Sequence, residues 1–270
     1  MTEIVFLGCG GGRLQTVDQT FRTGGFRIHD NVNLHVDPGP GALLLSREFG
    51  LDPNDLDGLA ISHSHPDHYA DAEIMIESIG RESPTGGILI GNKTLLEGID
   101  GGHPAISRYH MEKIGRVVSM TEDAMIEFRG IEFEATRTEH SDPKGIGFNI
   151  HTESGTIGYT GDTQFFDGLQ DVFSDVRVLI ANVTRPDEKR IDGHLCSEDL
   201  IKMLKSVQPE MAVILHMGML FLQNPPGEES SRIEKETGVK TISGFAGTKL
   251  EIGEKVRLSR VSRQGELNDF

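Results

Sequence analysis

The chain of 270 residues contains few cysteines, no long apolar run and fewer positive than negative charges. Its two cysteines, Cys9 and Cys196, lie far apart and fit no Cys-x-x-Cys pattern, so we expect two reduced thiols in a cytoplasmic protein. No stretch approaches the roughly 18 consecutive apolar residues that a membrane helix needs. The first residues lack the basic region of a signal peptide and resemble a first strand. We therefore expect no association with a membrane.

The shortage of positive charge restricts the class of partner. Lysine and arginine total 26 against 42 acidic residues, which gives a formal net charge of −16. Proteins that bind long nucleic acids usually present a basic face, because phosphate contacts supply most of their non-specific affinity. A long nucleic acid is therefore a disfavoured partner, whereas a small substrate attracted by the charge of a metal ion fits. A homodimer is compatible with the sequence.

Apolar runs and period-two alternation predict a mixture of strands and helices. The glycine-rich segment 8–12 is expected to be a loop with no helix after it, and Ser197 is expected to cap a helix. No linker or low-complexity segment interrupts the chain, which predicts a single domain over residues 1–270, with two comparable halves that divide near residue 137. We expect strands at 4–7, 26–36, 56–62, 87–90, 117–118, 125–135, 147–159, 176–181, 211–215 and 240–252, and helices at 41–49, 70–79, 169–173 and 230–237.

The segment from His63 to His68, His-Ser-His-Pro-Asp-His, is the most informative part of the sequence. An extended backbone directs His63 and His65 to the same side. Pro66 cannot donate to a sheet, and the turn that it introduces directs Asp67 and His68 to a second point nearby. Imidazole and carboxylate groups are suitable zinc ligands. Two pairs of ligands in one loop therefore predict a centre with two metal ions.

Three further donors occur where predicted strands end. His140 follows the alternating segment that ends near residue 135, Asp162 follows the apolar segment 156–159, and His216 follows the apolar segment 211–215. Taken singly, each donor is as compatible with an ordinary loop residue as with a ligand. Loops at strand ends can converge on one site, so together they are candidates to complete the metal centre.

The pattern His-x-His-x-Asp-His, followed in order by His140, Asp162 and His216, resembles the metallo-β-lactamase superfamily. The resemblance covers residues 33–216 and implies a four-layer αββα sandwich of the α+β class, with the metal site at one edge. It assigns His63, His65 and His140 to one ion, and Asp67, His68 and His216 to the other, with Asp162 as the bridge. Asp37 matches an early aspartate that supports the metal loop, although an ordinary turn residue fits the sequence equally well.

Two departures that would redirect the chemistry are absent from the sequence. A cysteine at the bridging position would indicate a β-lactamase type of centre, and a glutamate in place of His65 would indicate an iron-containing redox branch. Neither is present, which favours hydrolysis and two divalent ions, with Zn²⁺ preferred and Mn²⁺ or Fe²⁺ as alternatives.

His194 indicates which branch of the superfamily the sequence resembles. It stands just before the helix expected at Ser197, and it resembles a histidine of the phosphodiesterase branch, which includes transfer-RNA 3′-processing nucleases. There such a histidine contacts the phosphate or the leaving group, whereas the alternative is a histidine that only caps the helix. Only 22 positions (162 − 140) separate His140 from Asp162, too few for the arm of the transfer-RNA nucleases.

The sequence therefore predicts a dinuclear-zinc phosphodiesterase that cleaves a small phosphate ester through a metal-bridging hydroxide. Asp67 and His194 are the candidate catalytic residues, with His194 either protonating the leaving group or binding the phosphate. One alternative is a hydrolase of a lactone or thioester, which needs only a different pocket. The other is a metal-binding sensor or scaffold without turnover.

Overall fold

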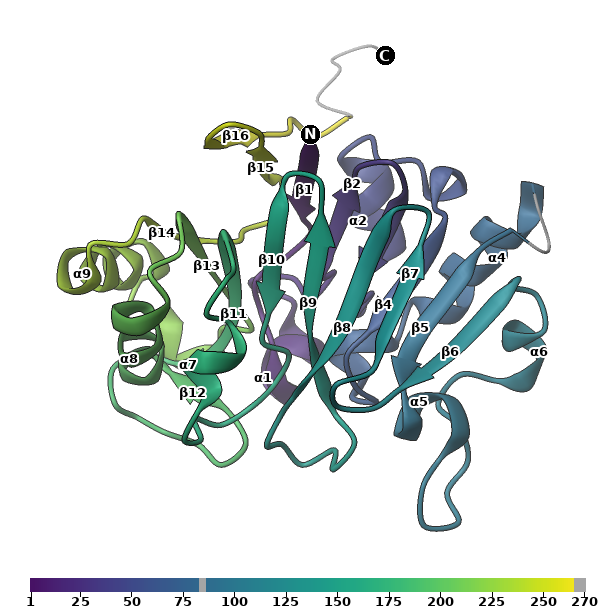
Figure 1. The fold of residues 1–270 in the computed structure, drawn as a ribbon, viewed down its shortest axis with the longest axis horizontal. Helices are drawn as coiled ribbons and strands as arrows, with labels where there is room; N and C mark the ends of the chain where they lie inside the picture. Colours follow the sequence, from purple (N-terminus) through teal and green to yellow (C-terminus); the bar gives the residue numbers. More distant parts are fainter. Residues whose placement is uncertain (83–85, 265–270) are drawn as a thin grey trace.

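A computed structural model describes residues 1–82 and 86–264 of the chain, and it forms four layers (Figure 1). Two large sheets face each other, and helices cover their outer faces. This is the αββα sandwich that the resemblance implies.

The first sheet combines both ends of the chain, in the order β16-β15-β1-β2-β3-β4-β5-β6. Its central strands β3 to β6 run parallel, while β1, β2 and the carboxyl-terminal strands pair antiparallel. The strands span Thr2–Phe6 (β1), Phe26–His29 (β2), Asn33–Val36 (β3), Gly58–Ile61 (β4), Ile88–Asn92 (β5), Arg116–Met120 (β6), Thr248–Ile252 (β15) and Val256–Arg260 (β16).

The second sheet has the order β14-β13-β11-β10-β9-β8-β7, with the short β12 paired to β11. Strands β7 to β10 form an antiparallel meander, and β10, β11, β13 and β14 are parallel. The strands span Met125–Phe128 (β7), Ile131–Arg137 (β8), Ile146–Thr152 (β9), Gly155–Tyr159 (β10), Val178–Arg185 (β11), Leu195–Cys196 (β12), Met211–Leu215 (β13) and Thr241–Ser243 (β14).

Helices α2 and α4 to α6 accompany the first sheet, and α7 to α9 accompany the second (Figure 1). The helices span Gly12–Asp18 (α1), Ala42–Glu48 (α2), Pro66–Tyr69 (α3), Ala72–Glu82 (α4), Lys93–Glu97 (α5), Arg108–Met111 (α6), Leu169–Val172 (α7), Ser197–Val207 (α8) and Pro226–Thr237 (α9), with 3₁₀ turns at Pro53–Asp55 and Met219–Leu222.

Alternation along the strands explains why the layers pack in this way. In β4, Ala60 joins the core between the two sheets, whereas Leu59 and Ile61 join the core beneath the helices. In β5, Ile88 and Ile90 likewise face the other sheet while Leu89 faces the helices. A strand that is buried on both faces is continuously apolar, as these sequences are. The central strands are therefore fixed from both sides, and the loops that follow them start from rigid positions.

Two details differ from the sequence expectations. A helix, α1, does begin at Gly12, although the preceding glycines indicated only a loop. Helix α8 is capped by Cys196 rather than Ser197, because the Asp199 carboxylate accepts a hydrogen bond from the Cys196 amide and so closes the first turn one residue earlier.

The order of the strands along the chain relates the two sheets to each other. The chain crosses to the second sheet between β6 and β7, before residue 124, because the β7–β8 hairpin pairs with β9. Strands β15 and β16 then return to the first sheet. The first sheet therefore combines strands from both ends of the chain, and the division into two halves near residue 137 stays a prediction.

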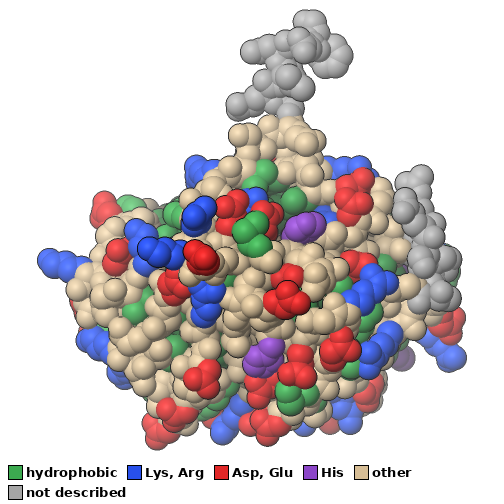
Figure 2. Space-filling model, turned by 45° about the horizontal axis from the view of Figure 1, so that its top comes forward, with side chains coloured by type: hydrophobic (Ala, Val, Ile, Leu, Met, Phe, Trp, Pro, Cys, Tyr) green, Lys and Arg blue, Asp and Glu red, His purple; other side chains and the backbone are tan. Residues whose placement is uncertain are grey.

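Both cysteines are buried free thiols, in agreement with the expectation of reduced cysteines. Within the described ranges, no helix has the length and apolar character required to cross a membrane. Acidic and basic side chains are interspersed on the face shown in Figure 2.

Candidate metal centre

The predicted donors all follow the carboxyl ends of strands. His63 comes two residues after β4, His140 three after β8, Asp162 three after β10 and His216 one after β13. Strands β8, β10 and β13 run in the same direction, so their carboxyl ends meet at one edge of the second sheet. The structure brings these donors together with the His63–His68 loop.

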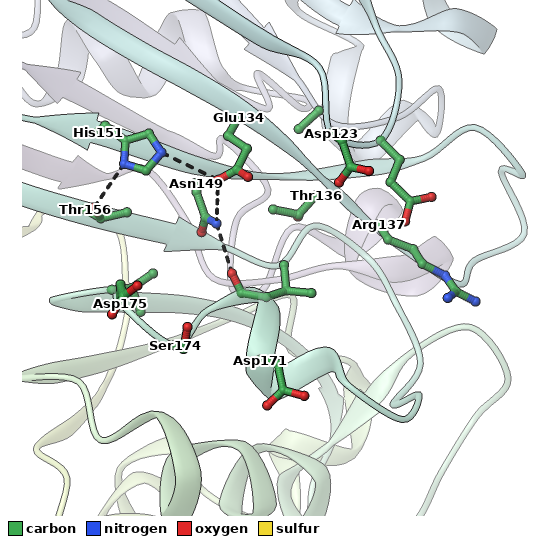
Figure 3. A pocket seen from close by; sticks show the side chains of 14 residues that line it. Asp123, Glu134, Thr136, Arg137, Asn149, His151, Thr156, Asp171, Ser174 and Asp175 are labelled. Carbon is green, nitrogen blue, oxygen red and sulfur yellow. Dashed lines mark hydrogen bonds and ion pairs between the residues drawn. The ribbon is translucent and has the colours of Figure 1, made fainter.

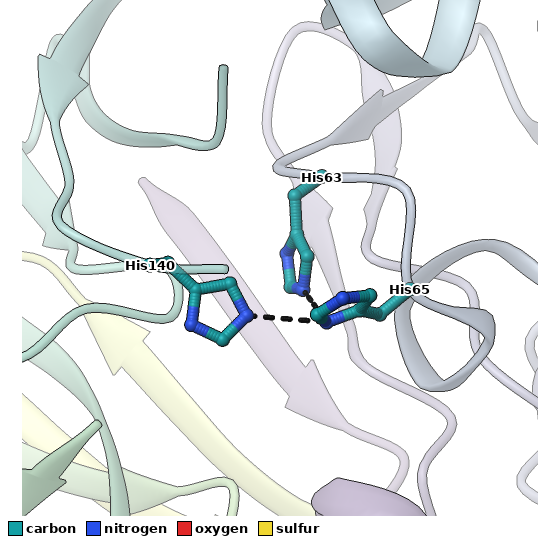
Figure 4. Close-up of side chains that lie close together, drawn as sticks. All are labelled: His63, His65 and His140. Atoms are coloured by element: carbon teal, nitrogen blue, oxygen red, sulfur yellow. Dashed lines mark hydrogen bonds between the residues drawn. The ribbon is translucent and has the colours of Figure 1, made fainter. Parts of the chain in front are cut away.

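The first group of donors consists of His63, His65 and His140, whose rings converge from two loops (Figure 4). His65 Nδ1 lies 3.0 Å from His63 Nε2 and 3.1 Å from His140 Nε2. As the alternation predicted, His63 and His65 face the same side. Burial lowers the pKa of both His63 and His65, which keeps these imidazoles neutral and available to a cation.

The second group consists of Asp67, His68 and His216. Pro66 begins the short helix α3, and this turn places Asp67 and His68 beside His216. The ring of His68 also packs against that of His63, with centroids 4.0 Å apart. Asp67 Oδ2 lies 3.2 Å from His216 Nε2 and 3.7 Å from His68 Nε2. One loop therefore does contribute to two adjacent groups, as predicted from Pro66.

Asp162 lies between the two groups. Its Oδ2 atom is 3.0 Å from His216 Nε2 and 3.5 Å from His68 Nε2. The same atom is 3.8 Å from Nε2 of both His63 and His140. Two ligand atoms bound tetrahedrally to one zinc ion at about 2.0–2.2 Å lie roughly 3.3–3.6 Å apart. The spacing of the donor atoms therefore fits two adjacent ions that share Asp162.

Four of the histidines are held through the nitrogen that faces away from the centre. Nδ1 of His68 pairs with Asp37 at 2.8 Å, Nδ1 of His140 with the Gly193 carbonyl at 2.8 Å, and Nδ1 of His216 with Thr184 Oγ1 at 2.9 Å. His63 Nδ1 pairs with Ser62 Oγ at 3.0 Å. Such contacts fix the tautomer that presents Nε2 to a metal. His68 Nε2 is buried without a hydrogen-bond partner among the described residues, as expected of a metal ligand.

Asp37 links the histidine loop to the second sheet through hydrogen bonds. It accepts hydrogen bonds from the Ser62 backbone and hydroxyl, from His68, and from the Tyr159 hydroxyl at 2.6 Å. Asn182 donates both to Tyr159 and, at 2.7 Å, to Asp162 Oδ1, which leaves Asp162 Oδ2 to face the histidines. The geometry therefore favours the supporting role over the turn residue for Asp37. Sequence reasoning missed Tyr159 and Asn182, because nothing in a strand pattern marks them.

Asp142 is a second support that the sequence did not reveal. It is buried, and it accepts hydrogen bonds from the Ser64 amide at 3.1 Å and the Ser64 hydroxyl at 2.9 Å. Asn92 at the end of β5 and Thr94 in α5 donate to it at 3.0 and 2.7 Å. Asp142 therefore attaches the histidine loop to the neighbouring strand. Its position two residues after His140 was the one available signal.

The glycine-rich segment 8–12 packs beneath the second group. A Cβ atom on Gly11 would lie 2.1–2.4 Å from three ring atoms of His216, and the Gly12 amide donates to Asp67 Oδ2 at 2.7 Å. The glycines therefore allow the backbone to approach the donors, and they do not serve as a dinucleotide motif.

We expect Gly11→Ala to lower affinity for the second metal ion by about 10–100-fold, the usual effect of disturbing the groups that orient a ligand. Gly11 is extended (φ −161°), so alanine meets no backbone strain and acts by displacing His216. Metal content after dialysis against a graded chelator measures the change. Gly227→Ala is the matched control, because a Cβ there meets nothing within 4 Å. Wild-type retention of both ions in Gly11→Ala would show that His216 is not a ligand.

Metal binding should depend on pH through His216 and His68. Burial opposes the charge on His216, but Asp162 and Asp67 outweigh it and raise the pKa to about 9 in the metal-free protein. For His68, the same carboxylates and Asp37 outweigh burial and raise the pKa well above its usual value. A metal ion binds the neutral imidazole, so these protons must leave, and affinity should rise with pH towards 9.

Calorimetric titration at pH 7 in buffers of different ionisation enthalpy should detect release of about two protons as the second group binds its ion. Zinc binding without proton release at pH 7 would contradict this protonation state.

His194 lies beside both groups. Its Nδ1 is 3.6 Å from Asp162 Oδ2, and its ring stacks on His216 with centroids 5.3 Å apart. With His140 and Asp162 it forms another set of donors close enough to hold an ion. Burial lowers the pKa of His194 to about 4, so its imidazole is neutral near pH 7. A neutral ring donates a hydrogen bond readily and a proton poorly, which favours phosphate binding over protonation of a leaving group.

Two cavities differ in their relation to these donors. One, of about 800 Å³, is lined by His65, Asp67, Asp162, His194 and His216. The other, of about 330 Å³, lies between β8–β10 and α7 (Figure 3). Acidic side chains such as Glu134 and Asp171 line it, and it shares no lining residue with the donor groups. The first cavity is therefore the candidate substrate site.

The beta-lactamase superfamily domain model matches residues 32–217, which contain every donor described above. An uncharacterized protein of Methanocaldococcus jannaschii is 42% identical over 254 residues, which cover 93% of this chain and 95% of that protein. Both matches include the site, and the second also covers most of the chain outside residues 32–217.

Solved structures agree on the fold. The metallo-beta-lactamase fold protein YhfI from Bacillus subtilis has a TM-score of 0.76 at 18% identity, and the match covers 93% of this chain and 100% of that one. A diphosphatase from the PhnP family has a TM-score of 0.67 at 12% identity, with 95% and 100% covered. The chain therefore belongs to the beta-lactamase superfamily and is a metal-dependent hydrolase of the metallo-β-lactamase fold.

Proposed function

We propose that the protein is a phosphodiesterase that uses two divalent metal ions, preferentially Zn²⁺, to cleave a small phosphate ester. His63, His65 and His140 would hold one ion, and Asp67, His68 and His216 the other, with Asp162 shared. Bound in this way, two ions supply an activated water and neutralise the charge of a phosphoryl group.

The position of His194 is the observation that carries the proposal. Its ring stands between His140 and His216, and it lines the cavity that contains the donors. A ligand bound in this cavity next to both groups would therefore meet the imidazole. Because His194 is neutral near pH 7, it can donate a hydrogen bond to a phosphate oxygen and hold the ester against the centre.

The short segment between His140 and Asp162 favours a small substrate. Strands β9 and β10 fill this segment as a tight hairpin that turns between Thr152 and Gly155, which leaves no room for an extended arm. With the formal charge of −16, this favours a small ester over a long nucleic acid. The diphosphatase among the solved structures of this fold is consistent with phosphate chemistry.

Turnover of bis-p-nitrophenyl phosphate by the zinc-loaded protein, measured beside a panel of lactones and thioesters, tests the proposal. We expect the diester to be cleaved with the higher kcat/KM, and activity to disappear on chelation and return with zinc. Faster hydrolysis of a lactone or thioester would reassign the substrate class. Two bound ions without turnover of any ester would identify a sensor or scaffold instead.

A further inference from the structure

The cavity of about 800 Å³ has one polar wall and one apolar wall. The donor groups and His194 form the polar wall. The apolar wall is formed by α1, by the loop before α8 and by the 3₁₀ turn after β13, and its apolar members are Leu14, Val17, Ile191, Met219 and Leu220.

The apolar wall is unusual because its side chains are exposed. Leu14 is 61% exposed, Val17 80% and Ile191 40%. Leu14 and Val17 are three residues apart on α1, which places them on one face of the helix. Single exposed apolar residues are common, but several that line one cavity beside a reactive centre mark a binding surface.

Contacts of its buried side hold helix α1 in place. Gln15 is fully buried, its side-chain oxygen accepts from the Phe21 amide at 3.1 Å, and its nitrogen lies 3.3 Å from the Met219 sulfur. The exposed face of α1 is therefore presented by a fixed helix. Replacing Leu14 or Val17 changes the wall without removing a contact of the core.

Two arginines line the same cavity, Arg13 at the start of α1 and Arg185 at the end of β11. Arg185 is half-buried at the end of β11, and within residues 1–82 and 86–264 its side chain makes no hydrogen bond or ion pair. Most other arginines of the described chain contact a carboxylate or carbonyl oxygen, as Arg177 and Arg232 do. A partly buried guanidinium without a partner is costly, and an anionic ligand would supply the missing acceptor.

We propose that the substrate is an anionic ester whose organic group is aromatic or alkyl. Arg185 binds the oxygens of the anion that face away from the donor groups, and the wall formed by Leu14, Val17 and Ile191 holds the organic group. This assignment rests on the proposed function for the identity of the anion as a phosphate. The complementarity is local, because Arg13 and Arg185 supply positive charge in a chain that is acidic overall.

Calorimetry with two phosphonates and the zinc-loaded protein distinguishes the contribution of the apolar wall to binding affinity from that of Arg185. Phenylphosphonate should bind at least about tenfold more tightly than methylphosphonate, since a hydrophobic pocket discriminates by this amount for small apolar differences. Leu14→Ser with Val17→Ser should bring this ratio close to one. Leu44→Ser is the matched control, because Leu44 is 73% exposed and outside the cavity, and it should leave the ratio unchanged.

Arg185→Gln should weaken both phosphonates by about tenfold or more, because a hydrogen bond to a charged group is lost, and should leave their ratio unaltered. Arg257→Gln, on the exposed strand β16, is the control. Equal affinity of wild-type protein for the two phosphonates would overturn the apolar assignment. Wild-type affinity in Arg185→Gln would overturn the role of Arg185.

The experiments distinguish a wrong assignment of the organic group from a wrong assignment of the phosphodiesterase activity. A preserved preference for phenylphosphonate without turnover of any phosphate ester would remove the phosphodiesterase and leave the class of organic group standing. Turnover of bis-p-nitrophenyl phosphate without a preference between the phosphonates would support the phosphodiesterase and remove the assignment of the organic group.

Discussion

Asp162→Ala should lower hydrolysis of bis-p-nitrophenyl phosphate by about 10³-fold or more, while the protein stays folded. Asp162 Oδ2 lies 3.0–3.8 Å from donor atoms of both groups, so its loss removes the negative charge that allows two cations to lie side by side. Loss of one ion removes the charge neutralisation that a two-metal centre provides, which is worth several kcal/mol. Metal content should fall from two ions per chain towards one.

The structure separates this effect from unfolding. Asp162 Oδ1 accepts a hydrogen bond from Asn182, and Asp162 lies in a loop after β10 rather than within a sheet. The circular dichroism spectrum should therefore stay close to that of the wild type. Asn182→Ala is an informative companion, because it releases Oδ1 and keeps the carboxylate, so about 10–100-fold in metal affinity should be lost. Undiminished turnover in Asp162→Ala would rule out a shared carboxylate.

His194→Ala should lower kcat/KM by about 10²–10³-fold, the usual effect of removing one hydrogen-bond donor from a developing charge. Burial lowers the pKa of His194 to about 4, so we expect a neutral ring at pH 7, which favours a hydrogen bond to phosphate over protonation of a leaving group. Alkyl diesters and p-nitrophenyl diesters should therefore lose rate to a similar extent. Steady-state kinetics with both substrates at pH 7 measures this.

Metal analysis of the same variant completes the test. His194 lies close enough to His140 and Asp162 to be a ligand itself, so retention of both ions in His194→Ala, against loss in His140→Ala, would assign it to the substrate. A far larger loss for alkyl diesters would instead make His194 the general acid. No loss for either substrate would reduce it to a structural histidine before α8.

The sequence could predict that the candidate donors lie together because much of their arrangement is local. His63, His65, Asp67 and His68 lie within six residues, and the alternation of a strand followed by Pro66 determines how they divide. The remaining donors, such as Asp162 and His216, directly follow apolar strands whose limits are visible in the sequence. Their positions at strand ends made these residues candidates, and the resemblance to the superfamily supplied their order and roles. In the structure, the parallel strands bring these carboxyl ends to one edge.

The supporting groups could not be predicted in this way, because each depends on a contact between distant segments. Tyr159 lies 122 positions from Asp37, and Gly11 contacts His216 across the whole chain. The helix after Gly11 was missed because it spans only seven residues with two apolar ones, Leu14 and Val17, too few to establish a helical period beside a glycine-rich loop. In this chain, the exceptions to regular patterning line the candidate site.

The measurement that tests the central claim most directly is anomalous diffraction at the zinc edge from crystals of the zinc-loaded protein. The account predicts two peaks about 3.5–4 Å apart. One should lie about 2.0–2.2 Å from the facing atoms of His63, His65 and His140, the other from those of Asp67, His68 and His216, with Asp162 between them. A single peak, or a second peak out of reach of Asp162 and His216, would contradict a shared two-metal centre.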